Sequence, residues 1–187
     1  FKMFDFICQN VPKNSQLQVS NSSAIRYLQL FDLDKSIQVF CNRGTSGIDG
    51  STSTAIGAAL ASDLPTMLIT GDISFLYDSN ALWNNYIPKN FKIILLNNSG
   101  GGIFRILPGH QETETFNTYF ETSHQLNALH LAKMYGFDYY TATDEDSLKT
   151  SYKSFLNQNN KPCILEIFTP EKSNNRILLD FFGALKK

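Results

Sequence analysis

Residues 66–74 read TMLITGDIS, and residues 91–98 read FKIILLNN. Each stretch is a run of mostly apolar residues that ends in polar ones, without alternation between apolar and polar positions. Uninterrupted apolar runs of this length are typical of strands that are covered on both faces, as in a parallel sheet. The two stretches therefore predict neighbouring buried strands with polar turns at their carboxyl ends.

Strands and helices are predicted to alternate along most of the chain. Further strands are expected at 37–41, 137–141 and 163–168. The helices are expected at 24–31, 51–62, 74–86, 126–135 and 144–156 and near the C-terminus. This alternation predicts an α/β fold, a three-layer sandwich with a mostly parallel central sheet.

The first residues do not follow that alternation. We expect residues 1–20 to be an irregular lead-in or linker from a missing upstream domain, and residues 21–187 to form the cofactor-binding domain described below. The chain begins at Phe1 without an initiator methionine, which also suggests a fragment of a longer protein.

Composition excludes several classes of function. Hydrophobic residues make up 42% and charged residues 18% of the 187, which is an ordinary globular balance. The net charge of −1 provides no field that would attract nucleic acid, and the apolar runs are too short to cross a membrane. Cys8, Cys41 and Cys163 are widely spaced and are expected to be free thiols, which suits a cytoplasmic location.

The polar turns after the two apolar strands predict a cation site. In parallel sheets, ligands bind beyond the carboxyl ends of the strands. Asp72 lies there before a helix whose N-terminus would attract phosphate, and a carboxylate at that place needs a cation between itself and the phosphate. The Asn98 side chain and the Gly100 backbone would add the hard oxygens that Mg²⁺ prefers, and Mn²⁺ would suit the same three ligands. An ordinary helix-capping Asp and a glycine loop without chemical meaning are the alternatives.

Three segments carry a resemblance to a known family. They read NRGTSGIDG at 42–50, GDISFLYD at 71–78 and NNSGGGIF at 97–104. A Gly-Asp pair followed some two dozen residues later by Asn-Asn resembles the thiamine-diphosphate signature, although Ile73 stands where that signature usually has a second glycine. Together the segments resemble MenD, the family of 2-succinyl-5-enolpyruvyl-6-hydroxy-3-cyclohexene-1-carboxylate synthases, over about residues 20–185.

The resemblance implies a fold, a cofactor and an activity. The fold would be the thiamine-diphosphate-binding, or pyrophosphate, domain, and the cofactors thiamine diphosphate and Mg²⁺. The activity would be that of a transferase of menaquinone biosynthesis, which decarboxylates 2-oxoglutarate and adds the succinyl-semialdehyde carbanion to isochorismate. In the family, the glutamate that activates the cofactor comes from the N-terminal domain of a partner subunit. We therefore expect no catalytic residue in this chain, no turnover by the chain alone, and self-association with active sites between subunits.

The resemblance also implies particular binding residues. The cofactor-binding positions are Ile48, Gly71, Asp72, Ile73, Ser74, Asn98, Gly100, Ile103 and Phe104. Ile48 would hold the cofactor in a bent conformation, and Ile103 and Phe104 would keep water from the reacting centre. Because both substrates are dicarboxylates, Arg26 and Arg43 are expected to bind them, together with the Ser22 hydroxyl.

Other interpretations stay open at this point. One is a different thiamine-diphosphate decarboxylase, similar to acetolactate synthase. Another is a non-catalytic Rossmann-like nucleotide-binding module, although no Gly-x-Gly-x-x-Gly turn follows the first strand.

Residues 103–123 are expected to form a functional loop. His110, His124 and His130 are expected to be loop or surface residues without a chemical role.

Overall fold

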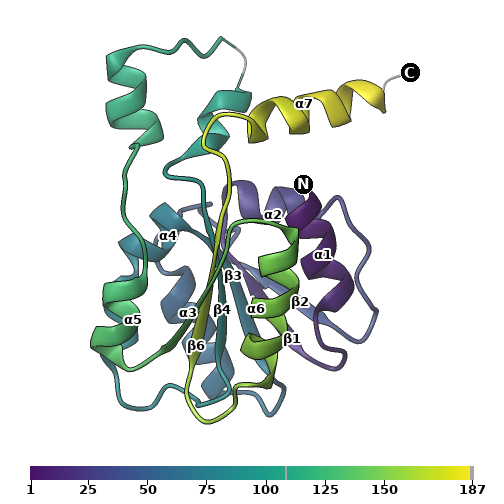
Figure 1. Ribbon diagram of the computed structural model, residues 1–187, viewed down its shortest axis with the longest axis vertical. Coiled ribbons are helices and arrows are strands. Elements are labelled where there is room, and N and C mark those ends of the chain that lie inside the picture. The colour runs from purple at the N-terminus through teal and green to yellow at the C-terminus, as the bar shows by residue number, and fades with distance from the viewer. Residues whose placement is uncertain (108, 186–187) are drawn as a thin grey trace.

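A six-stranded sheet forms the centre of the molecule (Figure 1). The computed structural model describes residues 1–107 and 109–185; Pro108 of the predicted loop and the last two residues of the predicted domain lie outside the described residues. All six strands pair in parallel, in the order β2-β1-β3-β4-β6-β5. Their bounds are β1 Gln16–Val19, β2 Gln38–Cys41, β3 Thr66–Gly71, β4 Lys92–Asn97, β5 Asp138–Ala142 and β6 Cys163–Phe168.

Helices cover both faces of this sheet, which confirms the predicted three-layer sandwich. The α-helices are α1 Lys2–Asn10, α2 Ser23–Leu28, α3 Ser51–Leu60, α4 Asp72–Tyr77, α5 Leu129–Tyr135, α6 Glu145–Asn157 and α7 Asn174–Ala184. Short 3-10 turns span Ser79–Trp83 (η1) and Gly102–Ile106 (η2), and a π-helical turn spans Phe116–Glu121 (η3).

Successive side chains of the central strands enter two separate cores. Ile94 belongs to the core that α1, α2 and α6 cover, whereas Ile93 and Leu95 belong to the core under α3, α4 and α5. Neighbouring residues of a strand point to opposite faces, so a continuous apolar run fills both cores. This is the reason that the uninterrupted runs predicted these strands correctly.

The prediction that residues 1–20 are irregular is wrong. α1 packs Phe4 and Ile7 into the core, and β1 lies inside the sheet between β2 and β3. β1 reads QLQV, and all four of its residues are buried. Two glutamines interrupt the apolar pattern of this strand. The buried Gln16 side chain lies with its amide nitrogen 3.4 Å from the Thr66 hydroxyl. The existence of an upstream domain stays a prediction.

The predicted helix at 74–86 is also divided differently. α4 begins at Asp72, ends at Tyr77 and is followed by η1. Asp78 separates the two, since its buried carboxylate accepts hydrogen bonds from the backbone N–H and the hydroxyl of Ser53 on α3, both at 2.6 Å. This contact with another helix turns the chain after α4. The other predicted elements have boundaries within a few residues of those observed.

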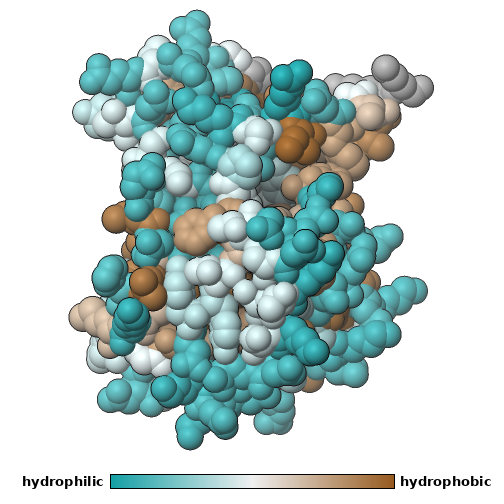
Figure 2. All heavy atoms as spheres, viewed as in Figure 1, coloured by the Kyte–Doolittle hydropathy of each residue, from teal (hydrophilic) through white to brown (hydrophobic). Residues whose placement is uncertain are grey.

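α7 extends beyond the sheet above the carboxyl ends of its strands (Figure 1). Hydrophobic residues gather around this helix in the space-filling view (Figure 2), and its exposed apolar side chains include Ile177, Leu179 and Phe182. Within residues 1–107 and 109–185, no helix has the length and apolar character to cross a membrane.

Candidate functional site

A cavity of about 970 Å³ lies at the carboxyl edge of the sheet. Segments that follow all six strands line it, and each contributes at least one polar residue: Asn21, Arg43, Asp72, Asn98, Thr143 and Thr169. The strand order reverses direction between β1 and β3, and open α/β sheets bind ligands at such a point. The topology therefore places the cavity where the sequence predicts a ligand.

Asp72 and the turn after β4 lie in direct contact at this edge. The carboxylate of Asp72 is buried, and its Oδ2 accepts hydrogen bonds from the backbone N–H groups of Asn98 at 3.1 Å and Gly100 at 3.0 Å. Its Oδ1 accepts one from the N–H of Ile73 at 2.8 Å. Because β3 and β4 are adjacent in parallel register, their tips meet, and the predicted proximity of Asp72 and Asn98 is confirmed.

The three residues predicted to bind the cation are linked by hydrogen bonds to one another. The Asn98 side-chain nitrogen donates to the backbone oxygen of Gly100 at 2.9 Å, so the amide of Asn98 and this carbonyl are neighbours beside Asp72. One carboxylate, one amide and one backbone carbonyl are hard donors of the kind that Mg²⁺ takes when substrate phosphates complete its shell. The donor set therefore fits the predicted cation.

Burial raises the pKa of Asp72 above its usual value. The N–H donors of the turn and the nearby His124 act in the opposite direction and favour the carboxylate. A bound cation would add to this second effect, because an opposite charge at close range stabilises the ionised form.

The glycine run is packed too closely for side chains. A Cβ on Gly100, whose φ is +153°, would lie 2.8 Å from the backbone oxygen of Glu121. A Cβ on Gly101 would lie 3.1 Å from the Phe120 oxygen, and one on Gly102 3.0 Å from the Asn98 side chain. The turn thus passes between the Asp72 carboxylate on one side and η3 on the other.

Ile48 and Ser74, both predicted to bind cofactor, are joined directly. The Ser74 hydroxyl donates to the backbone oxygen of Ile48 at 2.5 Å, and both residues line the cavity with Gly71 and Ile73. This bond ties the loop after β2 to the first turn of α4. Ile48 is only partly buried, so its side chain is available to a ligand.

Asn21 holds the same loop from the other side, a role that the sequence did not reveal. Asn21 precedes α2, but no side chain caps the start of that helix. The buried Asn21 side chain donates instead to the backbone oxygens of Asn42 and, at 2.6 Å, of Gly47, and it accepts from Arg43 at 3.2 Å. An asparagine before a helix is an ordinary capping signal, and only the arrangement of β1 beside β2 shows its actual partners.

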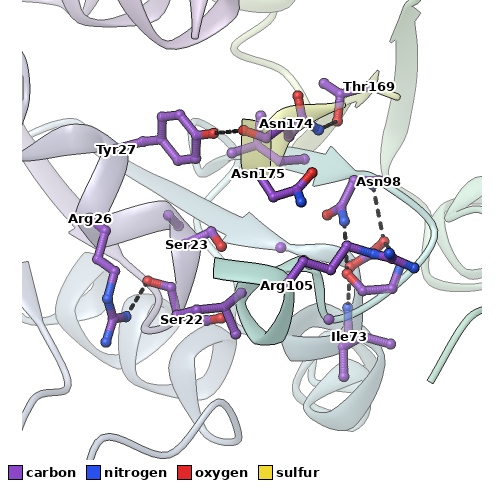
Figure 3. A pocket seen from close by; sticks show the side chains of 18 of the residues that line it. Ser22, Ser23, Arg26, Tyr27, Ile73, Asn98, Arg105, Thr169, Asn174 and Asn175 are labelled. Atoms are coloured by element: carbon purple, nitrogen blue, oxygen red, sulfur yellow. Dashed lines mark hydrogen bonds between the residues drawn. The ribbon is translucent and has the colours of Figure 1, made fainter. Parts of the chain in front are cut away.

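Ser22, Arg26 and Arg43 lie on the cavity wall, as Figure 3 shows for the first two. The Arg26 guanidinium donates to the backbone oxygen of Ser22 at 2.7 Å, and both arginines are solvent-exposed. Ser22 adopts a positive φ of 71°, which is uncommon outside glycine. The three residues predicted to bind a dicarboxylate are thus brought to one side of the cavity.

Ile103 and Phe104, on η2, also line the cavity. The ring of Phe104 packs edge-to-face on Phe120 of η3 at 5.8 Å. A buried ion pair that the sequence did not indicate joins the same two turns, because Arg105 binds Glu121 through two of its nitrogens. The predicted loop at 103–123 is therefore ordered around this pair where the structure describes it.

The three histidines are loop or surface residues, as expected, and the absence of a chemical role stays a prediction, but His124 has an environment that the sequence did not reveal. His110 and His130 are exposed, but the His124 side chain is only 11% exposed, and its Nε2 lies 3.3 Å from Asp72 Oδ2. No pattern in the sequence marks His124, because the course of the loop after η3 brings it to the tip of β3.

Comparisons with known proteins agree on the type of domain. Residues 21–167 match the family described as "Thiamine pyrophosphate enzyme, C-terminal TPP binding domain". The chain is 69% identical over 185 residues to the 2-succinyl-5-enolpyruvyl-6-hydroxy-3-cyclohexene-1-carboxylate synthase of Flavobacterium psychrophilum, which covers 99% of this chain and 34% of that protein. It is 43% identical over 182 residues to the synthase of the same name from Bacteroides fragilis, with 96% of this chain and 33% of that protein covered.

The chain thus spans about a third of the length of the curated relatives that it matches. Among solved structures, it is similar to the Rhodococcus jostii thiamine diphosphate-dependent 4-hydroxybenzoylformate decarboxylase. The TM-score is 0.69 and the identity 24%, over 90% of this chain and 32% of the other. At that identity the likeness concerns the fold alone.

Proposed function

Because the chain belongs to the thiamine pyrophosphate enzyme family, as a C-terminal TPP-binding domain, we propose that it holds the diphosphate end of thiamine diphosphate through Mg²⁺. We further propose that the whole protein is a 2-succinyl-5-enolpyruvyl-6-hydroxy-3-cyclohexene-1-carboxylate synthase, a transferase of menaquinone biosynthesis. The names of relatives that are up to 69% identical support this activity. It would act on 2-oxoglutarate and isochorismate.

The contact between the tips of β3 and β4 carries the proposal. Asp72, Asn98 and Gly100 supply three oxygens for the cation, and diphosphate oxygens and water would complete an octahedral shell. The backbone N–H groups of the turn orient the Asp72 carboxylate, and the glycines let the turn pass between that carboxylate and η3. When bound, the cofactor supplies the thiazolium chemistry of decarboxylation and carbon–carbon bond formation.

Other residues of the cavity would bind substrate and exclude water. Arg26 and Arg43 can each form two parallel hydrogen bonds to a carboxylate, which suits dicarboxylic substrates better than pyruvate. Ser22 offers a hydroxyl beside them. Ile103 and Phe104, which also line the cavity, provide apolar surface that would keep water from the reacting atoms.

Further parts of the whole protein belong to the proposal as well. The glutamate that activates the cofactor would come from a partner subunit, so that active sites form between subunits of a cytoplasmic homo-oligomer. Exposed apolar side chains near the cavity, including Tyr119, Phe120 and Ile177, support burial by another part of the assembly.

Calorimetric titration of the protein as its gene encodes it, with thiamine diphosphate in the presence and absence of Mg²⁺, tests the proposed site. We expect Mg²⁺-dependent binding that Asp72→Ala weakens at least about 100-fold, since it removes the only carboxylate among the proposed ligands. The matched control is Asp63→Ala, which removes an exposed carboxylate in the loop after α3 and should leave binding unchanged.

Wild-type affinity in the Asp72→Ala variant would refute the assignment. Turnover of pyruvate in preference to 2-oxoglutarate by the wild-type protein would refute the proposed substrate.

A further inference from the structure

His124 is held at the cation site from two directions. Its backbone N–H donates to the Ser99 oxygen at 3.1 Å, which attaches it to the turn between Asn98 and Gly100. Its ring Nδ1 accepts the backbone N–H of Leu126 at 3.1 Å. The backbone oxygen of Leu126 in turn accepts from the Asn97 side chain at 2.9 Å. These hydrogen bonds fix both the backbone and the imidazole ring of His124 beside the turn that follows β4.

The hydrogen bond at Nδ1 decides which ring nitrogen carries the proton. Since Nδ1 accepts a hydrogen bond from Leu126, the proton of the neutral ring lies on Nε2. Nε2 is buried and makes no hydrogen bond of good geometry among the described residues, and Asp72 Oδ2 lies 3.3 Å away. At this distance the Nε2–H lies against Oδ2 as an electrostatic contact, and the ring orientation does not give a hydrogen bond.

The two oxygens of Asp72 are surrounded unequally. Oδ2 already accepts from Asn98 and Gly100, and His124 approaches the same atom, whereas Oδ1 accepts only the N–H of Ile73. A carboxylate oxygen has two lone-pair positions, so Oδ1 retains one, whereas Asn98 and Gly100 already use both positions of Oδ2. The donors on Oδ2 thus favour Oδ1 as the oxygen presented to a cation.

We propose that His124 is a positioning residue, whose Nε2–H lies against Oδ2 and helps to hold the Asp72 carboxylate so that Oδ1 is left free for the bound cation. This inference rests on the proposed function, because it concerns the same cation. Groups that orient metal ligands typically contribute 10–100-fold to metal affinity. His124 touches neither substrate nor cofactor in this role and acts only through Asp72.

The test compares His124→Phe with His124→Gln in the protein as its gene encodes it. Phenylalanine keeps the ring size and removes both nitrogens, while glutamine can place an N–H donor near the position of Nε2. The readout is the dissociation constant of Mn²⁺ in the presence of thiamine diphosphate, followed by electron paramagnetic resonance. We expect His124→Phe to weaken Mn²⁺ binding about 10–100-fold and His124→Gln to stay within about threefold of the wild type.

The possible failures are distinguishable. If the wild-type protein binds Mn²⁺ with cofactor and His124→Phe binds it equally well, the inference is overturned and the proposed function stands. If the wild-type protein shows no cation-dependent cofactor binding, the proposed function fails, and the inference fails with it.

A measurement on the unmutated protein covers the case in which the phenylalanine variant does not fold. Nitrogen NMR of the ¹⁵N-histidine-labelled protein should show His124 protonated at Nε2 and unprotonated at Nδ1. Protonation at Nδ1 alone would overturn the inference.

Discussion

Replacing Gly100 with alanine would force a methyl group into a space that the backbone of η3 occupies. The added Cβ would lie 2.8 Å from the Glu121 backbone oxygen, where ordinary van der Waals contact begins at 3.4 Å, and 3.2 Å from the Glu121 side chain. The φ of +153° is also one that residues with a side chain rarely adopt. Glu121 is fully buried and cannot move aside without disturbing its neighbours.

The loss of folding stability follows from these contacts. Overpacking of this kind costs about 1–3 kcal/mol. Movement of the turn would also weaken the bond from the Gly100 N–H to Asp72 at 3.0 Å, and a hydrogen bond to a charged group contributes about 1.5–3 kcal/mol. Since the effects overlap, we expect Gly100→Ala to lower the free energy of unfolding by about 2–5 kcal/mol in total.

Urea denaturation followed by far-ultraviolet circular dichroism measures this change. With a dependence on urea of about 2 kcal/mol per molar, the midpoint should fall by roughly 1–2.5 M. The control is Gly57→Ala in α3, where a Cβ meets nothing within 4 Å. Alanine is the better helix former there, so this variant should be more stable by about 0.5–1 kcal/mol. Equal midpoints for the Gly100→Ala variant and the wild type would refute the packing argument.

Two other features of the structure give measurable expectations. Arg105→Met should lower the free energy of unfolding by about 3–5 kcal/mol, because it leaves the buried Glu121 carboxylate without its cation. Glu112→Gln alters the half-exposed partner of the same guanidinium and should lower the free energy of unfolding much less; equal urea midpoints for the two variants would contradict this ranking. Iodoacetamide at pH 8 should label the partly exposed Cys41 in the native protein but leave Cys163 unmodified until denaturation. Burial raises the pKa of the Cys163 thiol to about 11, so about one thiol in a thousand would be ionised, and mass spectrometry that finds Cys163 labelled as fast as Cys41 would show this reasoning to be wrong.

The order of elements and the contact between two strand tips could be predicted from local patterns. Thr66–Gly71 and Lys92–Asn97 are apolar on both faces, and only a strand inside a covered parallel sheet buries such a run. Consecutive strands of this type usually lie next to each other, so Asp72 and Asn98 had to meet. The need for glycine in this turn could also be predicted, since a backbone that passes close to other atoms requires residues without a side chain.

β1, the orientation of Asn21 and the position of His124 were decided by the tertiary structure. β1 alternates glutamine with apolar residues, a pattern typical of a half-exposed strand, yet its place between β2 and β3 buries it completely. Asn21 and His124 find their partners on segments far away in the sequence, after β2 and β3 respectively. Secondary-structure propensity and hydrophobic periodicity depend on residues that are close in the sequence. The partner of a polar side chain depends instead on which distant segments pack beside it.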